Sequence, residues 1–148
     1  MEIKELTKGD IPKALDLVLN VFMEYEAPDY SEQGIETFQN CMKDDEWLKS
    51  LQCFGAYMNN SLVGVIAARN NGNHIALFFV NGKYHRQGIG RRLFDRVVEN
   101  STNNTITVNS SPYAVKIYRH LGFSETQDEQ LTDGMRYTPM SFVKNIGV

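Results

Sequence analysis

The segment that most constrains the fold is an apolar run that leads through a short loop into an amphipathic helix pattern. His74 to Val80 is almost continuously apolar and predicts a central strand buried on both faces of a sheet. From Gly88 to Asn100, apolar side chains recur at four-residue spacing and predict a helix with one buried face. A chain with this unit is expected to build a sheet with helices packed on it.

The loop between strand and helix concentrates positive charge. Four basic residues fall within ten positions that contain no acidic residue: Lys83, Arg86, Arg91 and Arg92. A helix N-terminus already carries partial positive charge, so arginines there are unfavourable unless an anion is bound. Gly88 and Gly90 lack a Cβ, which lets a phosphate approach the free N–H groups of the first turn. We predict a diphosphate-binding loop; the alternative is a tight turn with solvated arginines.

Periodicity and turn residues predict a mixed sheet with helices on its faces. Further helices are expected from an N-cap at Asp10 to about Glu26, from Ser31 to about Asp44, and from Ser111 to Leu121. Further strands are expected at Glu2 to Leu6, Phe54 to Met58, Leu62 to Ala68, Thr105 to Val108, Phe123 to Thr126 and Met135 to Val143. The expected total is about seven strands and about four helices.

Composition narrows the classes of function. The length of 148 residues predicts one domain, residues 1–148. A net charge of −3 argues against wholesale binding of nucleic acid or anionic membrane. Cys41 and Cys53 lack metal-ligand spacing, so no metal site is predicted. The absence of a long apolar run and of a secretory signal in the first residues leads us to expect a cytoplasmic protein.

Two motifs resemble those of the GNAT superfamily of N-acetyltransferases. His85-Arg86-Gln87-Gly88-Ile89-Gly90 is similar to the family pattern Gln/Arg-x-x-Gly-x-Gly/Ala, with histidine in place of the first residue. The segment from Asn109 to Ala114, followed by Tyr118, looks like a second motif of the family. The resemblance covers nearly the whole chain, and it implies the GNAT fold with a mixed, mostly antiparallel sheet.

The resemblance also implies acetyl-coenzyme A as co-substrate. The main chain of the central strand would pair with the pantetheine arm, and this strand would splay from the next one along the sheet. Asn109 would contact the cofactor or acceptor, although it could equally cap the following helix. The implied cofactor-binding residues are Phe78, Phe79, Val80, His85, Arg86, Gln87, Gly88, Ile89, Gly90, Arg91 and Asn109.

For catalysis, the resemblance points to Tyr118 as the acid that protonates the departing thiolate; the alternative is an ordinary core aromatic residue. A cluster of carboxylates where the first two helices meet would favour a cationic amine, and the predicted substrate-binding residues are Glu24, Glu26 and Tyr30. No base stands out. The two histidines considered for it are His74 and His85.

These observations predict an N-acetyltransferase that transfers an acetyl group from acetyl-coenzyme A to a primary amine by direct attack in a ternary complex. Neither cysteine has the basic neighbours that would support an acetyl-cysteine intermediate. The alternatives are a non-catalytic acyl-coenzyme A-binding module and a general nucleotide-binding domain. Dimers are common among similar proteins, so the resemblance allows a homodimer.

Overall fold

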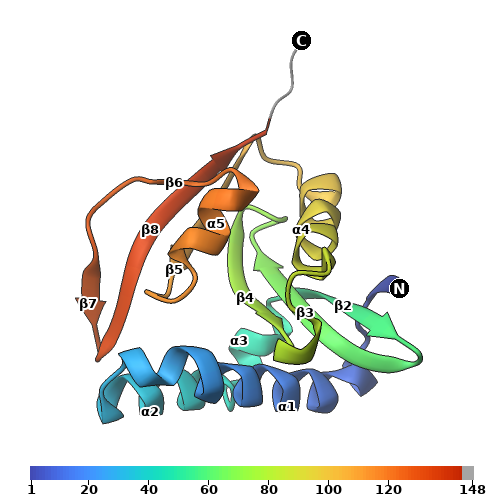
Figure 1. Cartoon of the computed structure of the whole chain (residues 1–148), viewed down its shortest axis with the longest axis horizontal. Helices are drawn as coiled ribbons and strands as arrows, with labels where there is room; N and C mark the ends of the chain where they lie inside the picture. The colour runs from blue at the N-terminus through green and yellow to red at the C-terminus, as the bar shows by residue number, and fades with distance from the viewer. Residues whose placement is uncertain (145–148) are drawn as a thin grey trace.

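A computed structural model describes residues 1–144 of the chain (Figure 1). The α-helices in this range are α1 (Ile11–Val21), α2 (Glu32–Cys41), α3 (Asp45–Lys49), α4 (Ile89–Asn100) and α5 (Val115–Leu121). The strands are β1 (Glu2–Glu5), β2 (Gln52–Met58), β3 (Ser61–Arg69), β4 (His74–Val80), β5 (Thr105–Ser110), β6 (Ser124–Glu125), β7 (Gln130–Thr132) and β8 (Met135–Val143). A π-helical turn, Phe22–Glu26, extends α1.

The strands form a mixed, mostly antiparallel sheet. Their order is β1-β2-β3-β4-β5-β8-β6, and β7 pairs with β8 beside this path. Within the described part of the chain, β4 and β5 make the one parallel pair, and the other pairs are antiparallel. The predicted fold class is therefore confirmed.

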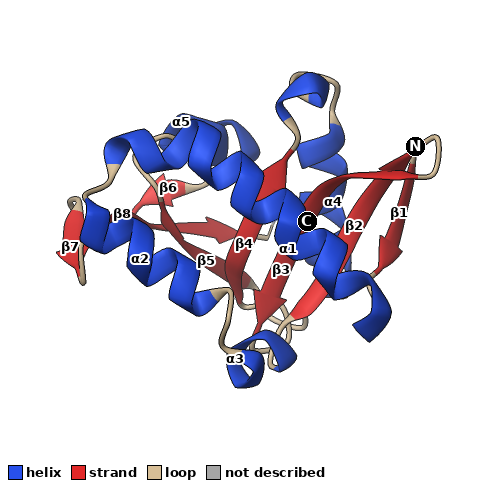
Figure 2. Cartoon of the chain, turned by 90° about the horizontal axis from the view of Figure 1, so that it is seen from below, coloured by secondary structure: helices blue, strands red, loops and turns tan. Residues whose placement is uncertain are grey.

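Helices cover both faces of the sheet, as Figure 2 shows with α1 and α2 in front of the strands. On that face, Val18 and Phe22 pack against Val65 and Phe79. On the opposite face, α4 inserts Leu93 and its neighbours at helical spacing into a second core that includes Tyr118 of α5. The helix periodicities in the sequence thus correspond to the two faces of one sheet.

The predicted elements are present, with corrections at their ends. β7 and α3 are missing from the prediction because three and five residues are too few to establish a period. The Asp10 carboxylate accepts hydrogen bonds from the backbone N–H and hydroxyl of Thr7, at 2.8 and 2.9 Å, so its side chain does not cap α1. The last predicted helix was expected from Ser111, but α5 begins only at Val115 after a turn.

The prediction that β4 is buried on both faces is wrong, because Phe78 and Val80 are only half-buried. The strand also contains a bulge. Ile75 pairs with Ala68 and Leu77 pairs with Ala67, so Ala76 is an extra residue. Phe78 and Val80 consequently face the α4 side and remain half-buried, whereas Leu77 and Phe79 enter the α1 side. The apolar run therefore reflects one buried face and one half-buried face.

The bulge also marks the point where β4 leaves its parallel neighbour. Pairing of β4 with β5 is limited to His74 with Thr107 and Ile75 with Val108. Beyond Ile75 the two strands diverge, as the resemblance implied. The divergence leaves one side of the second half of β4 without a partner strand.

Candidate active site

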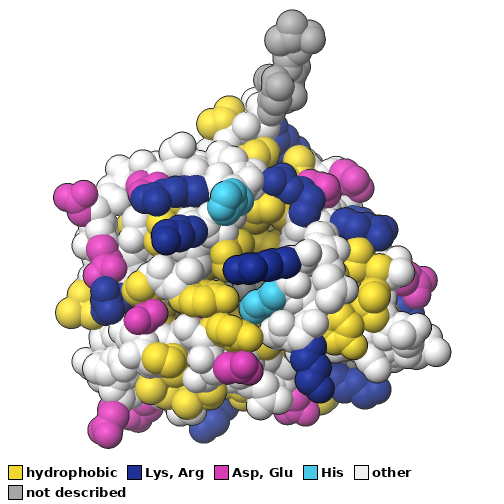
Figure 3. Space-filling model, in the orientation of Figure 1, with side chains coloured by type: hydrophobic (Ala, Val, Ile, Leu, Met, Phe, Trp, Pro, Cys, Tyr) yellow, Lys and Arg dark blue, Asp and Glu magenta, His cyan; other side chains and the backbone are white. Residues whose placement is uncertain are grey.

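A cleft of about 590 Å³ lies beside the unpaired half of β4. It is bordered by β4, by the loop that precedes α4, and by α5. Phe78 and Tyr118 supply apolar walls, and Arg86 and Lys116 supply positive charge. Figure 3 shows the basic and histidine side chains on this face around a hollow with hydrophobic side chains. The cleft suits an elongated ligand with an anionic end.

The loop before α4 presents free backbone donors. No residue among 1–144 accepts a hydrogen bond from the backbone N–H groups of residues 86–91. Arg86 and Gly88 both have left-handed backbones, with φ of 65° and 80°, although this conformation costs a residue such as arginine about 1–2 kcal/mol. Left-handed residues so close together produce a concave run of N–H groups that binds anions. The loop therefore has the backbone geometry of an anion-binding site.

The glycines leave this run of donors uncovered. A Cβ on Gly88 would have no atom within 4 Å, and a Cβ on Gly90 would lie 3.5 Å from the Phe78 ring. Because Phe78 lines the cleft, a side chain at position 90 would project into the space between α4 and β4.

The side chains of the loop differ in their roles. Arg86, Arg91 and His85 line the cleft. The Arg91 guanidinium also donates to the His120 carbonyl at 2.9 Å, which links α4 to the C-terminal end of α5. The Gln87 side chain donates to the Lys83 carbonyl at 3.4 Å and is not among the lining groups, so its predicted contribution rests on its backbone N–H.

His85, in the loop before α4, contacts the end of β4. Its Nε2 lies 2.7 Å from the Val80 carbonyl, to which a protonated Nε2 donates. Its ring centroid lies 5.0 Å from that of Tyr25. This bond ties the loop back to β4.

The open side of β4 carries free main-chain groups. The Asn81 N–H donates to the Val63 carbonyl at 2.8 Å, and hydrogen-bonded pairs alternate along an antiparallel ladder. The backbone of Phe79 is therefore directed to β3, whereas the N–H and C=O of Phe78 and the N–H of Val80 are directed to the gap. Of the three predicted strand residues, Phe78 and Val80 can thus pair with a ligand through the main chain.

A second cavity of about 210 Å³ lies next to the cleft. Both spaces are lined by Glu26, Phe78, Phe79, Ala114 and Tyr118, so they meet at these residues. Tyr30 and Asn109 line the smaller cavity only. Glu24 is exposed and lines neither space. The predicted residues therefore divide between two connected sites.

Glu26 is the charged side chain at this junction. It ends the π-helical turn, in which the Ala27 N–H donates to the Phe22 carbonyl five residues earlier. Burial raises the pKa of Glu26 to about 7; the neighbouring Ser111 hydroxyl opposes the shift, and Asp29 adds to it. A carboxyl group with this pKa exchanges protons readily near neutral pH.

Tyr118 lies across the junction from β4. Its ring is buried and packs edge-on against Phe78 and Phe123, with centroid distances of 5.9 and 5.2 Å. Burial, and then the charge of Glu26, raise the pKa of the phenol. Its hydroxyl has no hydrogen-bond partner within residues 1–144. No buried polar side-chain atom in this range is without a partner, so the hydroxyl is not fully buried and is accessible from the cavities.

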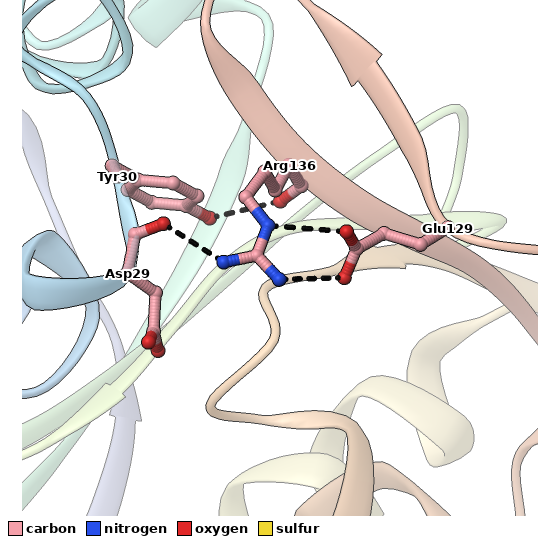
Figure 4. A network of polar contacts seen from close by, with 4 residues as sticks. All are labelled: Asp29, Tyr30, Glu129 and Arg136. Atoms are coloured by element: carbon pink, nitrogen blue, oxygen red, sulfur yellow. Dashed lines mark hydrogen bonds and ion pairs between the residues drawn. The ribbon is translucent and has the colours of Figure 1, made fainter.

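A polar clasp of Asp29, Tyr30, Glu129 and Arg136 includes one lining residue of the smaller cavity, Tyr30 (Figure 4). The Arg136 guanidinium donates to the Glu129 carboxylate at 3.1 and 3.3 Å and to the Asp29 carbonyl at 3.2 Å. The Tyr30 hydroxyl donates to the Arg136 carbonyl at 3.2 Å. These bonds fix the β7–β8 hairpin against the segment before α2, and so position Tyr30 and Met135 in the cavity wall.

Comparison with known families decides the relationship. The family model described as "Acetyltransferase (GNAT) domain" matches residues 26–144. The chain belongs to the GNAT acetyltransferase family. The matched range contains the loop before α4, Glu26, Tyr118 and all the residues that line the smaller cavity.

Solved GNAT structures share the fold at low sequence identity. A GCN5-related N-acetyltransferase from Rhodopseudomonas palustris superposes with a TM-score of 0.84 at 18% identity, covering 97% of this chain and 95% of the other. The PaiA N-acetyltransferase from Thermoplasma acidophilum, solved with coenzyme A, gives 0.74 at 19% identity and coverage of 97% and 98%. A GNAT acetyltransferase from Elizabethkingia anophelis with acetyl-CoA bound gives 0.63 at 21%, with 97% of each chain covered. No curated protein matches the sequence.

The sequence-based prediction of the GNAT site named Tyr118 of α5 but missed the basic residues of this helix. Lys116 and His120 line the larger cleft, one helical turn apart. Tyr113 lines it too, and its ring centroid is 5.3 Å from that of Tyr25, so the aromatic pair lies beside the cleft. The basic pair at i and i+4 was a usable signal, because it follows the second GNAT motif directly.

Other titratable groups of this GNAT chain are less suited to the chemistry. Burial lowers the pKa of His74 to about 4, and this residue lines neither cavity. Burial raises the pKa of Cys53 to about 11, and it also raises that of Cys41, which borders the smaller cavity. Among the residues described, no group of three metal-binding side chains occurs, and no helix has the length and apolar character needed to cross a membrane.

Proposed function

We propose that the protein is an N-acetyltransferase that transfers the acetyl group of acetyl-coenzyme A to a primary amine by direct attack in a ternary complex. The observation that carries the proposal is the meeting of two cavities at Glu26 and Tyr118. One cavity has an anion-binding loop and an open strand edge; the other has neither. Two substrates can therefore approach one junction from opposite sides.

The larger cleft fits coenzyme A. The free N–H groups of residues 86–91 match a diphosphate, with Arg86 and Lys116 nearby for its charge. The open main-chain groups of Phe78 and Val80 match the amides of a pantetheine arm, which would add to β4 like a strand. Acetyl-coenzyme A would supply an acetyl group activated as a thioester.

Glu26 is the base in this proposal. The bound ammonium group first gives one proton to the Glu26 carboxylate, which releases it to solvent. The free amine then attacks the thioester carbonyl, and Glu26 takes the second proton as the new C–N bond forms. A base with a pKa near 7 is ionised in about half of the molecules at neutral pH and still binds a proton well. No histidine lines the smaller cavity within the described chain.

Tyr118 is the acid. Its raised pKa keeps the phenol protonated at all working pH values, so its hydroxyl can donate to the sulfur. As the C–S bond breaks, the phenol proton moves to the thiolate while the proton held by Glu26 moves to the phenol oxygen, so no buried phenolate accumulates. The raised pKa of Cys41 keeps that thiol protonated, which disfavours an acetyl-cysteine intermediate.

The direct test is an assay of thiol release with product detection. The purified chain, acetyl-coenzyme A and a panel of primary amines are incubated, free coenzyme A is measured with a thiol reagent, and the amine is weighed by mass spectrometry. Thiol release that depends on amine, with a product heavier by one acetyl group, is the expected result. Binding of acetyl-coenzyme A without transfer to any amine would favour the non-catalytic module instead.

Replacing Tyr118 with phenylalanine is expected to lower kcat at least about tenfold, because only the proton-donating hydroxyl is removed. The ring contacts with Phe78 and Phe123 remain, so the affinity for acetyl-coenzyme A should change little. Tyr57→Phe, in β2 and outside both cavities, is the matched control. An unchanged kcat in the Tyr118 variant would remove this residue from the mechanism.

A further inference from the structure

We propose that the acceptor is a small primary amine with an uncharged, apolar body. This inference rests on the proposed function and specifies its second substrate. It is argued from the chemistry of the smaller cavity, from the position of its charged group, and from its size.

The walls of the smaller cavity are mainly apolar. They come from α2, α3, β4, β5 and the start of β8. The polar groups, Glu26 and the side chains of Tyr30, Asn109, Ser111 and Tyr118, accompany a larger apolar set. The apolar and sulfur-containing side chains are Phe38, Cys41, Met42, Trp47, Ile75, Ala76, Leu77, Phe78, Phe79, Val108, Ala114 and Met135.

Glu26 is the one charged side chain among these lining residues. It stands where the cavity meets the donor cleft, so an ammonium group attracted to it would lie beside the thioester. No lysine or arginine lines the cavity to receive a carboxylate, and no second acid lines it to receive a second ammonium group. A further charge on the acceptor would be buried without a partner, which is strongly unfavourable.

The cavity is also small. Its volume of about 210 Å³ is below the range of about 300–1,000 Å³ for sites of drug-sized ligands. The clasp between Arg136, Glu129 and Asp29 holds the hairpin wall in place. An acceptor with several rings or a long chain would need that wall to move.

The experiment compares amines that differ by one charged group. Pentylamine is set against 1,5-diaminopentane, and 2-phenylethylamine against phenylalanine, all at saturating acetyl-coenzyme A. We expect kcat/KM for each monoamine to exceed that of its charged partner at least about a hundredfold.

A variant tests the same idea by gain of function. Met135 is half-buried in the cavity wall, so Met135→Glu adds a second carboxylate there. We expect this variant to lower the ratio of kcat/KM for pentylamine to kcat/KM for 1,5-diaminopentane at least tenfold. Leu131→Glu is the matched control, because Leu131 is 69% exposed on the same hairpin and should leave the preference unchanged. Circular dichroism and the affinity for coenzyme A verify that the variant folds. If it does not fold, the comparison of amines with the wild-type protein alone tests the inference.

The outcomes separate this inference from the proposed function. Faster turnover of the diamine or of phenylalanine would overturn the inference and leave the acetyltransferase proposal standing. Equal use of hexanoyl- and acetyl-coenzyme A, without discrimination among amines, would assign the apolar cavity to the acyl chain and overturn the inference as well. No transfer to any amine, with intact binding of acetyl-coenzyme A, would refute the proposed function itself.

Discussion

Replacing Glu26 with glutamine is expected to lower kcat at least about a hundredfold, because a positioned general base typically contributes a factor of about 10²–10⁴. Glutamine keeps the size of the side chain but cannot accept the amine proton. In the described part of the chain, Glu26 makes no hydrogen bond with the loop before α4 or with the open edge of β4. The affinity for coenzyme A, measured by calorimetry, should therefore stay within a few fold of the wild-type value.

The pH dependence tests the role of Glu26 more specifically. Because the carboxylate must be ionised to accept a proton, kcat/KM of the wild-type protein should rise with pH through about 7 and then level off. The residual kcat/KM of Glu26→Gln should lack this rise. Glu24→Gln is the matched control, since Glu24 lies in the same turn but is exposed and lines neither cavity.

The same pKa has a consequence for stability. The folded-state pKa of about 7 lies above the unfolded value of 4.5, so the folded state holds a proton that the unfolded state has released. The free energy of unfolding contributed by Glu26 is thus fully present below pH 4.5 and is lost as the pH rises to about 7. The Tm of Glu26→Gln minus the Tm of wild type should therefore be larger at pH 8 than at pH 4. A Tm difference independent of pH, together with an unchanged kcat, would refute the assignment of Glu26.

Elements with a long, regular pattern were predictable from sequence. The boundaries of β4 and β8 match the structure, and α4 begins one residue after the predicted start. The loop from His85 to Gly90 was also interpretable, because its charges, glycines and position between strand and helix all indicate an anion. These are features in which neighbouring residues determine the local structure.

The positions of the residues at the junction depend on irregular backbone, which the periodicity of the sequence does not reveal. Glu26 belongs to a helix with apolar periodicity, and only the π-helical turn after Val21 brings it to the junction with a raised pKa. The sequence could place it among several acids but could not show that it lies at the junction. The bulge at Ala76 was equally unpredictable, because a regular strand and a bulged strand can have the same apolar composition.

Replacing Gly90 with leucine is expected to weaken the binding of coenzyme A more than about a hundredfold. The new side chain would start 3.5 Å from the Phe78 ring and extend into the cleft. A hydrogen bond to a charged group contributes about 1.5–3 kcal/mol, so losing two of the loop's bonds to a diphosphate gives a loss of this size. Calorimetric titration with coenzyme A, acetyl-coenzyme A, ATP and NAD measures it.

The choice of Gly90 separates binding from folding. Gly88 has a φ of 80°, so any substitution there would also strain the backbone, whereas Gly90 lies within α4. Leucine is a better helix former than glycine by nearly 1 kcal/mol, so Gly90→Leu should not lower the Tm. Gly9→Leu is the control, because a Cβ on Gly9 would meet only the Thr7 hydroxyl, at 3.9 Å.

The titration also distinguishes coenzyme A from nucleotides in general. A diphosphate alone would satisfy the loop, so ATP and NAD should bind weakly through it, whereas the open edge of β4 adds contacts that only a pantetheine arm can use. Wild-type binding of ATP as tight as that of coenzyme A would indicate a general nucleotide site. Tight binding of coenzyme A to Gly90→Leu would show that the cleft between α4 and β4 is not where coenzyme A binds, and the assignments of the loop and the strand edge would both fail.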